Sequence, residues 1–293
     1  MRFSKYHGTG NDFVLVEDMD DRVRLDPALI AAMCDRHAGV GADGVIRIAP
    51  GLTPGASFFM DYSNADGAVA EMCGNGIRCL GKYVFDRGLT SATELDVDTR
   101  AGVKHLWIDA EDGVAHRITV DMGPPSLDRA AIPMAGDPDS RFIGERLDVA
   151  GASFTATAVS MGNPHCVVFL KPGVDMQQLD VAGLGGAIER SPLFPNGTNV
   201  EFVQVVGDRI YVLVWERGSG RTMACGTGAC ASLVACSLQG LTGRQSELSF
   251  PGGRLQATWR EDGHVLLSGP AVCVFDGESD PAWEGIALEP VWR

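Results

Sequence analysis

A motif that occurs twice is the feature of this sequence that most restricts how the chain can fold. Cys73-Gly-Asn-Gly and Cys225-Gly-Thr-Gly lie 152 residues apart. The same offset relates two further pairs of polar residues, Asn11 with Asn163 and Asn64 with Glu216. A shared register of this kind predicts two related domains, each with a cysteine at the N-terminus of a helix.

The residues around each cysteine indicate acid–base chemistry and anion binding. At the N-terminus of a helix, glycines let backbone N–H groups face a ligand, and the helix lowers the pKa of a thiol there. Two domains related by a pseudo-twofold axis would present one cysteine to each side of a ligand in a cleft. Such a pair suits stereochemical inversion, since one group removes a proton and the other supplies it from behind. The N–H groups of Gly74, Asn75, Gly226 and Thr227 would hold a carboxylate that gains enolate character.

Packing offers a simpler explanation for either motif alone, because cysteine is commonly a core residue and glycine commonly caps turns. The repeated register favours function over packing for Cys73 and Cys225. The other six cysteines keep the structural explanation, since nothing polar recurs around them. His165 beside Cys166 could indicate a metal, but no second ligand pair lies at usable spacing, so no metal site is predicted.

The composition limits the classes of function. A chain of 293 residues is long enough for two domains with a core each. The net charge of −14 argues against a nucleic-acid-binding surface, which needs clustered Lys and Arg. The eight cysteines show no CxxC spacing, and the first residues, MRFSKYHGTG, have no apolar signal core. We therefore expect a protein of the reducing cytoplasm.

One long uncharged stretch raises the question of a membrane span. Thr222–Gly243 carries no charge for 22 residues, but four glycines and six Thr, Ser or Gln residues interrupt it. A helix that is apolar on all faces and rich in small residues is typical of one buried inside a domain. We therefore expect a buried helix and no contact with a membrane.

The rest of the chain alternates strand-like runs with helical patterns. Helices are expected from Asp26-Pro27 to about Arg36, over Met72–Phe85 and over most of Val174–Glu189. Val200–Val206 and Ile210–Trp215 are expected to form a hairpin. The tail AWEGIALEPVWR gives no readable pattern.

One enzyme family matches several segments of the chain as a set. They are FSKYHGTGNDFV, DRHAGVGADG, NADGAVAEMCGNGIRC, VSMGNPHCVV, GTNVEF, WERGSGRTMACGTGAC, PGGRL and GPAVCVFDG, spread from Arg2 to Gly277. In these segments the chain closely resembles diaminopimelate epimerases, the pyridoxal-independent racemases of lysine and peptidoglycan precursor synthesis. The resemblance implies an α+β fold of two pseudo-symmetric domains, each a barrel-like β-sheet wrapped round a central helix. Residues 1–120 with 269–293 would form the N-terminal domain, and residues 121–268 the C-terminal domain.

The resemblance also implies the roles of individual residues. Cys73 and Cys225 would be the acid–base pair at the α-carbon of diaminopimelate, interconverting its LL and meso forms without a cofactor. His165 and Glu216 match positions that tune the cysteine pKa values, and Glu216-Arg217 match a pair that reads the substrate's ammonium and carboxylate groups. The full set of matched substrate-binding positions is Asn11, Asn64, Gly74, Asn75, Asn163, Asn199, Glu216, Arg217, Gly226 and Thr227. The implied partners are the small-molecule substrate and a second copy of the chain in a homodimer.

Two positions depart from the family pattern. Some members have Gln where this chain has Gly44, so a substrate contact there would be absent or made by the backbone. A Tyr associated with dimer contact in some members is replaced by Phe275, which keeps the ring but lacks the hydroxyl.

Other functions stay open on the sequence. Proline and hydroxyproline racemases share the two-cysteine logic, but they typically carry CGHG at the first cysteine and lack the Glu-Arg pair. A histidine racemase on the same scaffold is harder to exclude, whereas a PhzF-like isomerase replaces the cysteine pair. A thiol redox protein that uses Cys73 and Cys225 as a reversible disulfide belongs to a different class, and the absence of CxxC argues against it.

Overall fold

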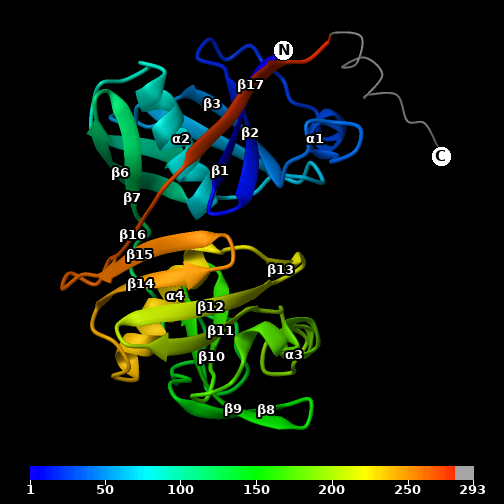
Figure 1. The fold of residues 1–293 in the computed structure, drawn as a ribbon, viewed down its shortest axis with the longest axis vertical. Coiled ribbons are helices and arrows are strands. Elements are labelled where there is room, and N and C mark those ends of the chain that lie inside the picture. Colours follow the sequence, from blue (N-terminus) through cyan, green and yellow to red (C-terminus); the bar gives the residue numbers. More distant parts are fainter. Residues whose placement is uncertain (281–293) are drawn as a thin grey trace. The chain divides into compact units, whose positions relative to one another are not determined.

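The computed structural model describes residues 1–280 and places them in two compact units (Figure 1). The first unit comprises Met1–Val120 and the chain from Gly269, and the second comprises Asp121–Ser268. The tail from Ala282, for which no structure was predicted from the sequence, lies outside the described residues. Each unit is a mixed sheet with a buried helix.

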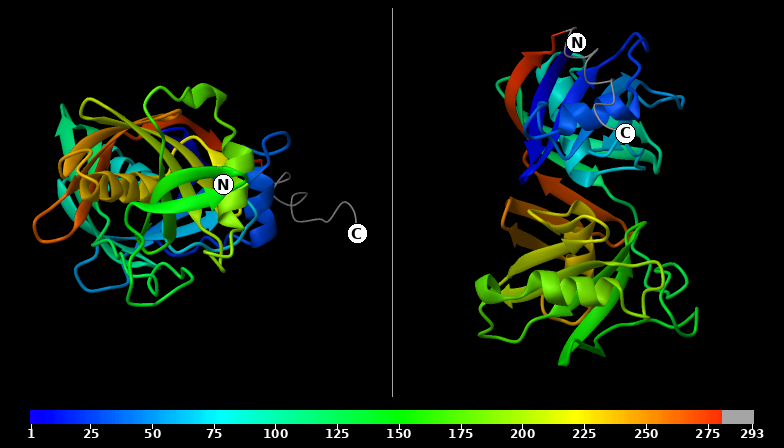
Figure 2. Two further views of the ribbon diagram at one scale, coloured as in Figure 1. Left: turned by 90° about the horizontal axis from the view of Figure 1, so that it is seen from below. Right: turned by 90° about the vertical axis from the view of Figure 1, so that its right-hand side faces the viewer.

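The described residues of the first unit form a mixed sheet of eight strands. In spatial order they are β17 (Val272–Glu278), β1 (Arg2–Gly8), β2 (Asn11–Glu17), β3 (Gly44–Pro50), β4 (Phe58–Asn64), β5 (Glu94–Thr99), β6 (Gly102–Glu111) and β7 (Val114–Asp121). The β2–β3 and β4–β5 pairs are parallel, and the other neighbours are antiparallel. Figures 1 and 2 show β17, at the end of the described chain, beside β1 at its start.

Two helices cover the faces of this sheet. α1 (Pro27–Cys34) begins at Asp26, whose side chain accepts a hydrogen bond from the Ala28 N–H at 2.8 Å. It packs against Val14 and Val16 of β2. Side chains alternate along a strand, so the equally buried Phe13 and Leu15 point to the other face. There α2 (Gly74–Asp86) contacts β1, β2 and β3.

The second unit has the same architecture. In spatial order its strands are β8 (Glu145–Val149), β9 (Ala152–Ser160), β10 (Pro164–Phe169), β11 (Asn199–Val206), β12 (Arg209–Glu216), β14 (Gln245–Phe250), β15 (Gly253–Trp259) and β16 (Val265–Gly269), with the short β13 (Gly220–Thr222) also on β12. The β10–β11 and β12–β14 pairs are parallel, and the others are antiparallel. The helices are α3 (Val181–Glu189) and α4 (Gly226–Leu238).

The repeat in the motifs is therefore a repeat of the whole fold. α2 and α4 both have 13 residues, and both follow a cysteine in an extended conformation. The sequence of parallel and antiparallel pairs from β1 to β7 recurs from β9 to β16. β17 corresponds to β8, because each pairs antiparallel with the first strand of its unit.

Helix α4 accounts for the uncharged stretch of sequence. It contacts β9, β10, β11, β12, β14 and β15, and the run from Gly228 to Cys236 is buried throughout. The prediction of a buried helix is confirmed. Among residues 1–280, no helix is both long enough and apolar enough to cross a membrane.

The expectation that most of Val174–Glu189 is helical is confirmed, but the helical residues form two elements. A 3₁₀ turn over Met176–Gln178 ends before α3 begins at Val181. Asp180 starts the new helix by accepting a hydrogen bond from the Gly183 N–H at 2.8 Å. The strands β8 and β13 were not expected, since five and three residues give too short an alternation to recognise.

Candidate active site

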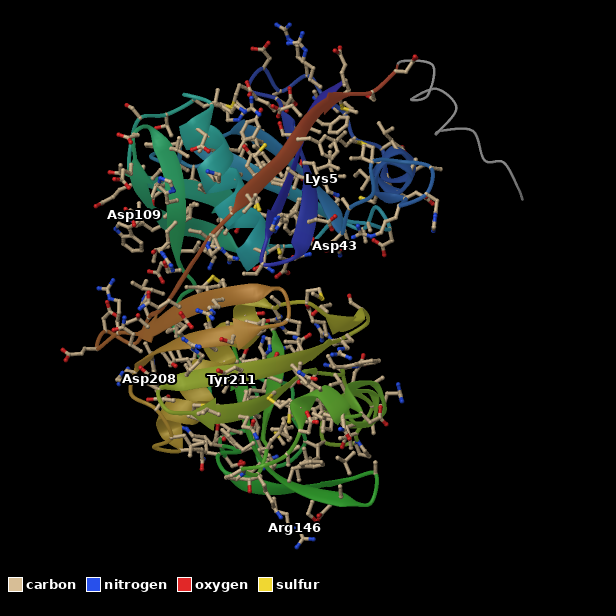
Figure 3. All side chains as sticks on the ribbon, viewed as in Figure 1. Lys5, Asp43, Asp109, Arg146, Asp208 and Tyr211 are labelled. Atoms are coloured by element: carbon tan, nitrogen blue, oxygen red, sulfur yellow. The ribbon has the colours of Figure 1, made fainter. Side chains whose placement is uncertain are left out.

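Cys73 is the N-cap residue of α2, as predicted, with φ −135° and ψ 120°. Its sulfur lies 3.6 Å from Oδ1 of Asn11, and the same oxygen accepts a hydrogen bond from Nδ2 of Asn75 at 3.2 Å. Asn11 is itself held by Asp43, labelled in Figure 3, which accepts from its Nδ2 at 2.6 Å. Three predicted residues, Asn11, Cys73 and Asn75, thus meet at the start of one helix.

A fully buried arginine, which the sequence analysis did not identify, supports this helix end. Arg78 donates from Nη1 to the carbonyl of Gly74 at 2.9 Å and from Nη2 to Oδ1 of Asn75 at 2.9 Å. Thr9 lies 3.4 Å from the same oxygen. The sequence did contain a signal for this residue, because Arg78 is the one charged residue in the otherwise uncharged run Gly74–Leu80 that follows Cys73.

Asn64 ends strand β4, and Gly44 begins β3 directly opposite it. Tyr62 donates its hydroxyl to Oδ1 of Asn64 at 2.9 Å. A Cβ atom at position 44 would lie 2.6 Å from Cε2 of Tyr62 and 2.5 Å from the carbonyl oxygen of Ser63. The Ser63 carbonyl and the Tyr62 ring therefore exclude a side chain at position 44, and the Tyr62 hydroxyl orients Asn64.

In the second unit, Cys225 is the N-cap residue of α4, with φ −125° and ψ 123°. Its sulfur accepts a hydrogen bond from the Gly228 N–H at 3.4 Å and lies 3.4 Å from Oγ1 of Thr227. Gly226 is the first residue of the helix. The side chain of Asn163 reaches the same end of the helix, donating from Nδ2 to Oγ1 of Thr227 at 3.3 Å.

The expectation of a lowered pKa is wrong for Cys225. Burial, which leaves the residue 6% exposed, raises the pKa of the thiol well above its usual range. The nearby carboxylate of Glu216 raises it further, because a second negative charge is disfavoured there. Hydrogen bonds from Thr227 and Gly228 lower the pKa of Cys225, but they do not outweigh burial.

Glu216 and Arg217 are held by contacts on both sides. Oε1 of Glu216 accepts from the Thr222 hydroxyl at 2.6 Å, and burial raises the pKa of this carboxyl. The N–H of Arg217 donates to Oδ1 of Asn199 at 2.9 Å, and its Nη1 donates to the carbonyl of Asn196 at 3.1 Å. Asn199 is fixed in turn, since its Nδ2 donates to the carbonyl of Pro164 at 2.9 Å.

Glu189 at the end of α3 was not identified from the sequence, yet it ties down the same segment. It accepts from Nε1 of Trp215 at 2.7 Å and from the N–H of Gly218 at 3.1 Å. These contacts lie immediately before and after Glu216-Arg217, so Glu189 fixes both ends of the pair. Only the fold brings a residue 26 positions away to this turn.

All eight cysteines, each within residues 1–280, are free. No group of three or more His, Cys, Asp or Glu side chains in the described chain is arranged to hold a metal ion.

Comparison with known proteins assigns the family. The family model for diaminopimelate epimerase matches residues 3–127 and 157–274. The chain is 48% identical over 281 residues to the diaminopimelate epimerase of Pelotomaculum thermopropionicum, covering 95% of this chain and 98% of that one. It is 44% identical over 286 residues to the diaminopimelate epimerase of Synechococcus elongatus, covering 96% and 99%. The chain belongs to the diaminopimelate epimerase family.

Solved structures at low identity share the fold of this family member. A probable proline racemase from Agrobacterium radiobacter matches with a TM-score of 0.69 at 16% identity, covering 97% of this chain and 95% of that one. A PhzF-family phenazine biosynthesis protein from Bacillus anthracis matches with a TM-score of 0.68 at 16% identity, covering 95% and 98%. The predicted α+β fold is confirmed, and these neighbours bear on the fold alone.

Proposed function

We propose that this chain is a cofactor-independent isomerase that interconverts LL- and meso-diaminopimelate, with Cys73 and Cys225 as its two acid–base groups. The observation that carries the proposal is that each unit contains an equivalent buried helix with a cysteine as its N-cap, in a member of the diaminopimelate epimerase family. A mechanism with one base on each face of the α-carbon needs two acid–base groups, and the repeat supplies two thiols at equivalent places in the fold.

The proposed reaction exchanges one proton for another. A thiolate takes the α-proton, so that a C–H bond breaks and an S–H bond forms. The electron pair spreads into the α-carboxylate, which the N–H groups at the starts of α2 and α4 stabilise. The other thiol then gives its proton to the opposite face of the carbon. The raised pKa of Cys225 suits the role of the thiol that gives up a proton.

The second amino-acid end of the substrate would be read by Glu216 and Arg217. An arginine fork binds a carboxylate in a bidentate manner, and a carboxylate binds an ammonium group. Asn199 holds the backbone of Arg217, which supports placing Asn199, with Asn64 and Asn163, in the substrate-binding set. This distal recognition would orient the substrate so that only one of its two centres reacts.

The proposed enzyme would act as a homodimer in the cytoplasm. β17 pairs with β1 on one side, and Val272, Val274 and Phe275 on it are 43%, 54% and 46% exposed. An apolar edge strand of this kind favours association with a second copy. Two catalytic thiols would also need a reducing compartment to stay active.

Incubation with LL-diaminopimelate in D2O tests the activity. We expect the α-proton signal to disappear from the NMR spectrum as meso-diaminopimelate accumulates, with reductant present and no added cofactor. Absence of α-exchange under reducing conditions would contradict the proposal. Exchange with proline or histidine in place of diaminopimelate would move the assignment to another racemase on the same scaffold.

A further inference from the structure

A fully buried ion pair lies behind Cys225. Nδ1 of His165 lies 2.8 Å from Oε1 of Glu201, and both side chains are 0% exposed. They come from the neighbouring parallel strands β10 and β11. The other carboxylate oxygen of Glu201 is buried and has no hydrogen-bond partner within residues 1–280. A buried carboxylate with one oxygen lacking a partner destabilises the folded state, so its presence points to a role other than stability.

A continuous chain of hydrogen bonds leads from this pair to the cysteine. Nε2 of His165 lies 3.0 Å from Oδ1 of Asn163, and Nδ2 of Asn163 donates to Oγ1 of Thr227 at 3.3 Å. Oγ1 of Thr227 lies 3.4 Å from the sulfur of Cys225. Glu201 is thus joined to the cysteine through three side chains, although it does not touch the sulfur in this chain of contacts.

The direction of each hydrogen bond follows from the atoms involved. With the Asn163 amide oriented as in the structure, both ring nitrogens of His165 face oxygen atoms, and an imidazole that donates to both carries a positive charge opposite Glu201. Asn163 accepts at Oδ1 and donates from Nδ2. Because Thr227 accepts that bond, its own hydroxyl hydrogen is left to donate to the sulfur of Cys225.

Packing does not require this ion pair, as the first unit shows. Phe13 pairs with Gly44 in the β2–β3 register, just as His165 pairs with Asn199 in the β10–β11 register. The counterparts of His165 and Glu201 are therefore Phe13 and Ile46, which are both 0% exposed.

The glycines of the two motifs confirm this correspondence. A Cβ at Gly76 would lie 2.8 Å from Cδ1 of Ile46, and a Cβ at Gly228 would lie 2.5 Å from Oε1 of Glu201. The same place in the fold holds hydrocarbon behind one cysteine and an ion pair behind the other.

We propose that Glu201 is a positioning residue for the Cys225 half of the active site: it holds His165 doubly protonated, so that Asn163 and Thr227 direct the Thr227 hydroxyl to the sulfur. This inference rests on the proposed function, because it gives Cys225 a role in proton transfer. The donated hydrogen bond stabilises the thiolate that Cys225 becomes when it gives up its proton. It offsets part of the opposing effect of burial and of Glu216.

Glu201→Gln tests the direction of the effect. The variant keeps an acceptor for Nδ1 but removes the charge, so buried His165 becomes neutral and its Nε2 turns into an acceptor. Asn163 then presents Nδ2 to His165 and Oδ1 to Thr227, whose hydroxyl turns away from Cys225. The pH midpoint for alkylation of Cys225 by iodoacetamide, followed by peptide mass mapping in a Cys73→Ser background, should rise by about one pH unit.

If Glu201 acted only through its negative charge, Glu201→Gln would shift the alkylation midpoint in the opposite direction. Acting alone, Glu201 raises the pKa of Cys225, so its removal would lower the alkylation midpoint. A lower or unchanged midpoint in Glu201→Gln would therefore overturn the proposal. The titratable groups linked to Cys225 among residues 1–280 include Glu216, Glu201 and His165, and the sign of the shift distinguishes the His165–Glu201 pair from Glu201 acting alone.

Steady-state kinetics with matched variants give the second readout. Glu201→Gln should lower kcat for diaminopimelate about tenfold to a hundredfold with little change in KM, the effect of losing a hydrogen bond to a charged group. The double variant His165→Phe with Glu201→Ile installs the pair found in the first unit, so it should fold with a thermal midpoint within about 5 °C of the wild type while losing kcat similarly. Glu247→Gln, which neutralises a partly buried carboxylate that pairs with Arg209 in the same unit, should keep the wild-type rate.

The outcomes separate the two proposals. A fully active double variant would overturn the positioning role of Glu201. If the wild type itself fails to exchange the α-proton of diaminopimelate, the proposed function fails instead. The alkylation experiment then still decides the role of Glu201, since it needs no substrate.

Discussion

At the scale of single residues, Cys225 experiences opposed influences. The N-terminus of α4 and the donors of Thr227 and Gly228 favour the thiolate, whereas burial and the carboxylate of Glu216 favour the thiol. Burial wins, so the pKa of Cys225 is raised. In the proposed mechanism Cys225 delivers a proton and then takes one back, and this balance gives each of its two forms its own stabilising neighbours.

Replacing either catalytic cysteine should abolish epimerisation without unfolding the chain. Cys73→Ala and Cys225→Ala each remove one of the two proton carriers, and loss of such a group typically costs about a hundredfold to ten-thousandfold in rate. Formation of meso- from LL-diaminopimelate measures activity, and circular dichroism measures the fold. Cys236→Ala is the control, because it removes a fully buried thiol from the same helix. Near wild-type epimerisation by either active-site variant would refute the two-base mechanism.

Neutralising Glu216 should shift the titration of Cys225 in the direction opposite to that of Glu201→Gln. The carboxylate of Glu216 raises the pKa of Cys225, so Glu216→Gln removes a repulsive charge and lowers it. The alkylation midpoint of Cys225 should therefore move to lower pH, and the thiolate should be present over a wider range below the wild-type midpoint. Iodoacetamide kinetics from pH 6 to 10, roughly spanning the usual thiol pKa, measure this. An upward shift would show that Glu216 acts on Cys225 mainly as a hydrogen-bond partner.

At the scale of elements, the sequence predicted what lies within one segment and missed what depends on pairing between segments. The cysteines at the starts of α2 and α4 were predictable, because the motif and the helix are contiguous. Glu201 and Glu189 were not. Glu201 meets His165 only because β10 and β11 pair in parallel across more than 30 residues, and Glu189 meets Trp215 only because α3 packs on β12.

Position 44 shows a related limit. The absence of Gln there was visible in the sequence, but the physical reason was not. The ring of Tyr62, from the facing strand β4, takes the space and turns its hydroxyl to Asn64. Cross-strand register places the two residues together, and register cannot be read from either strand alone.

Loosening the segment around Glu216-Arg217 should weaken substrate binding more than chemistry. Glu189→Gln replaces two charge-assisted contacts, to Trp215 and to Gly218, with weaker ones. We expect KM for diaminopimelate to rise about fivefold to tenfold with a smaller change in kcat. Trp215→Phe is the matched variant, since it removes only the contact from the indole and should show a smaller rise. Equal loss of kcat with an unchanged KM would place Glu189 in the chemical step and contradict this assignment.

At the scale of the whole molecule, the last described strand belongs to the first unit. β17 pairs antiparallel with β1, just as β8 pairs antiparallel with β9. Each unit thus has the same strand order, but the strand next to the first strand comes from a different part of the sequence. In the second unit this strand, β8, directly precedes β9 in the sequence. In the first unit it is β17, which follows all of the second unit in the sequence. Val272 and Val274 of this strand are exposed.

A charge on this edge should prevent the proposed dimer. The proposed substitution replaces Val274, which is 54% exposed, with Lys. A lysine is poorly tolerated in an apolar interface, and lysines on edge strands commonly prevent association with another chain. We expect the wild type to sediment as a dimer and Val274→Lys to sediment as a monomer at the same concentration. Val206→Lys is the control, because Val206 is 58% exposed on β11 in the other unit and should leave the dimer intact. A monomeric wild type, or a Val274→Lys variant that still dimerises, would show that β17 is not the interface.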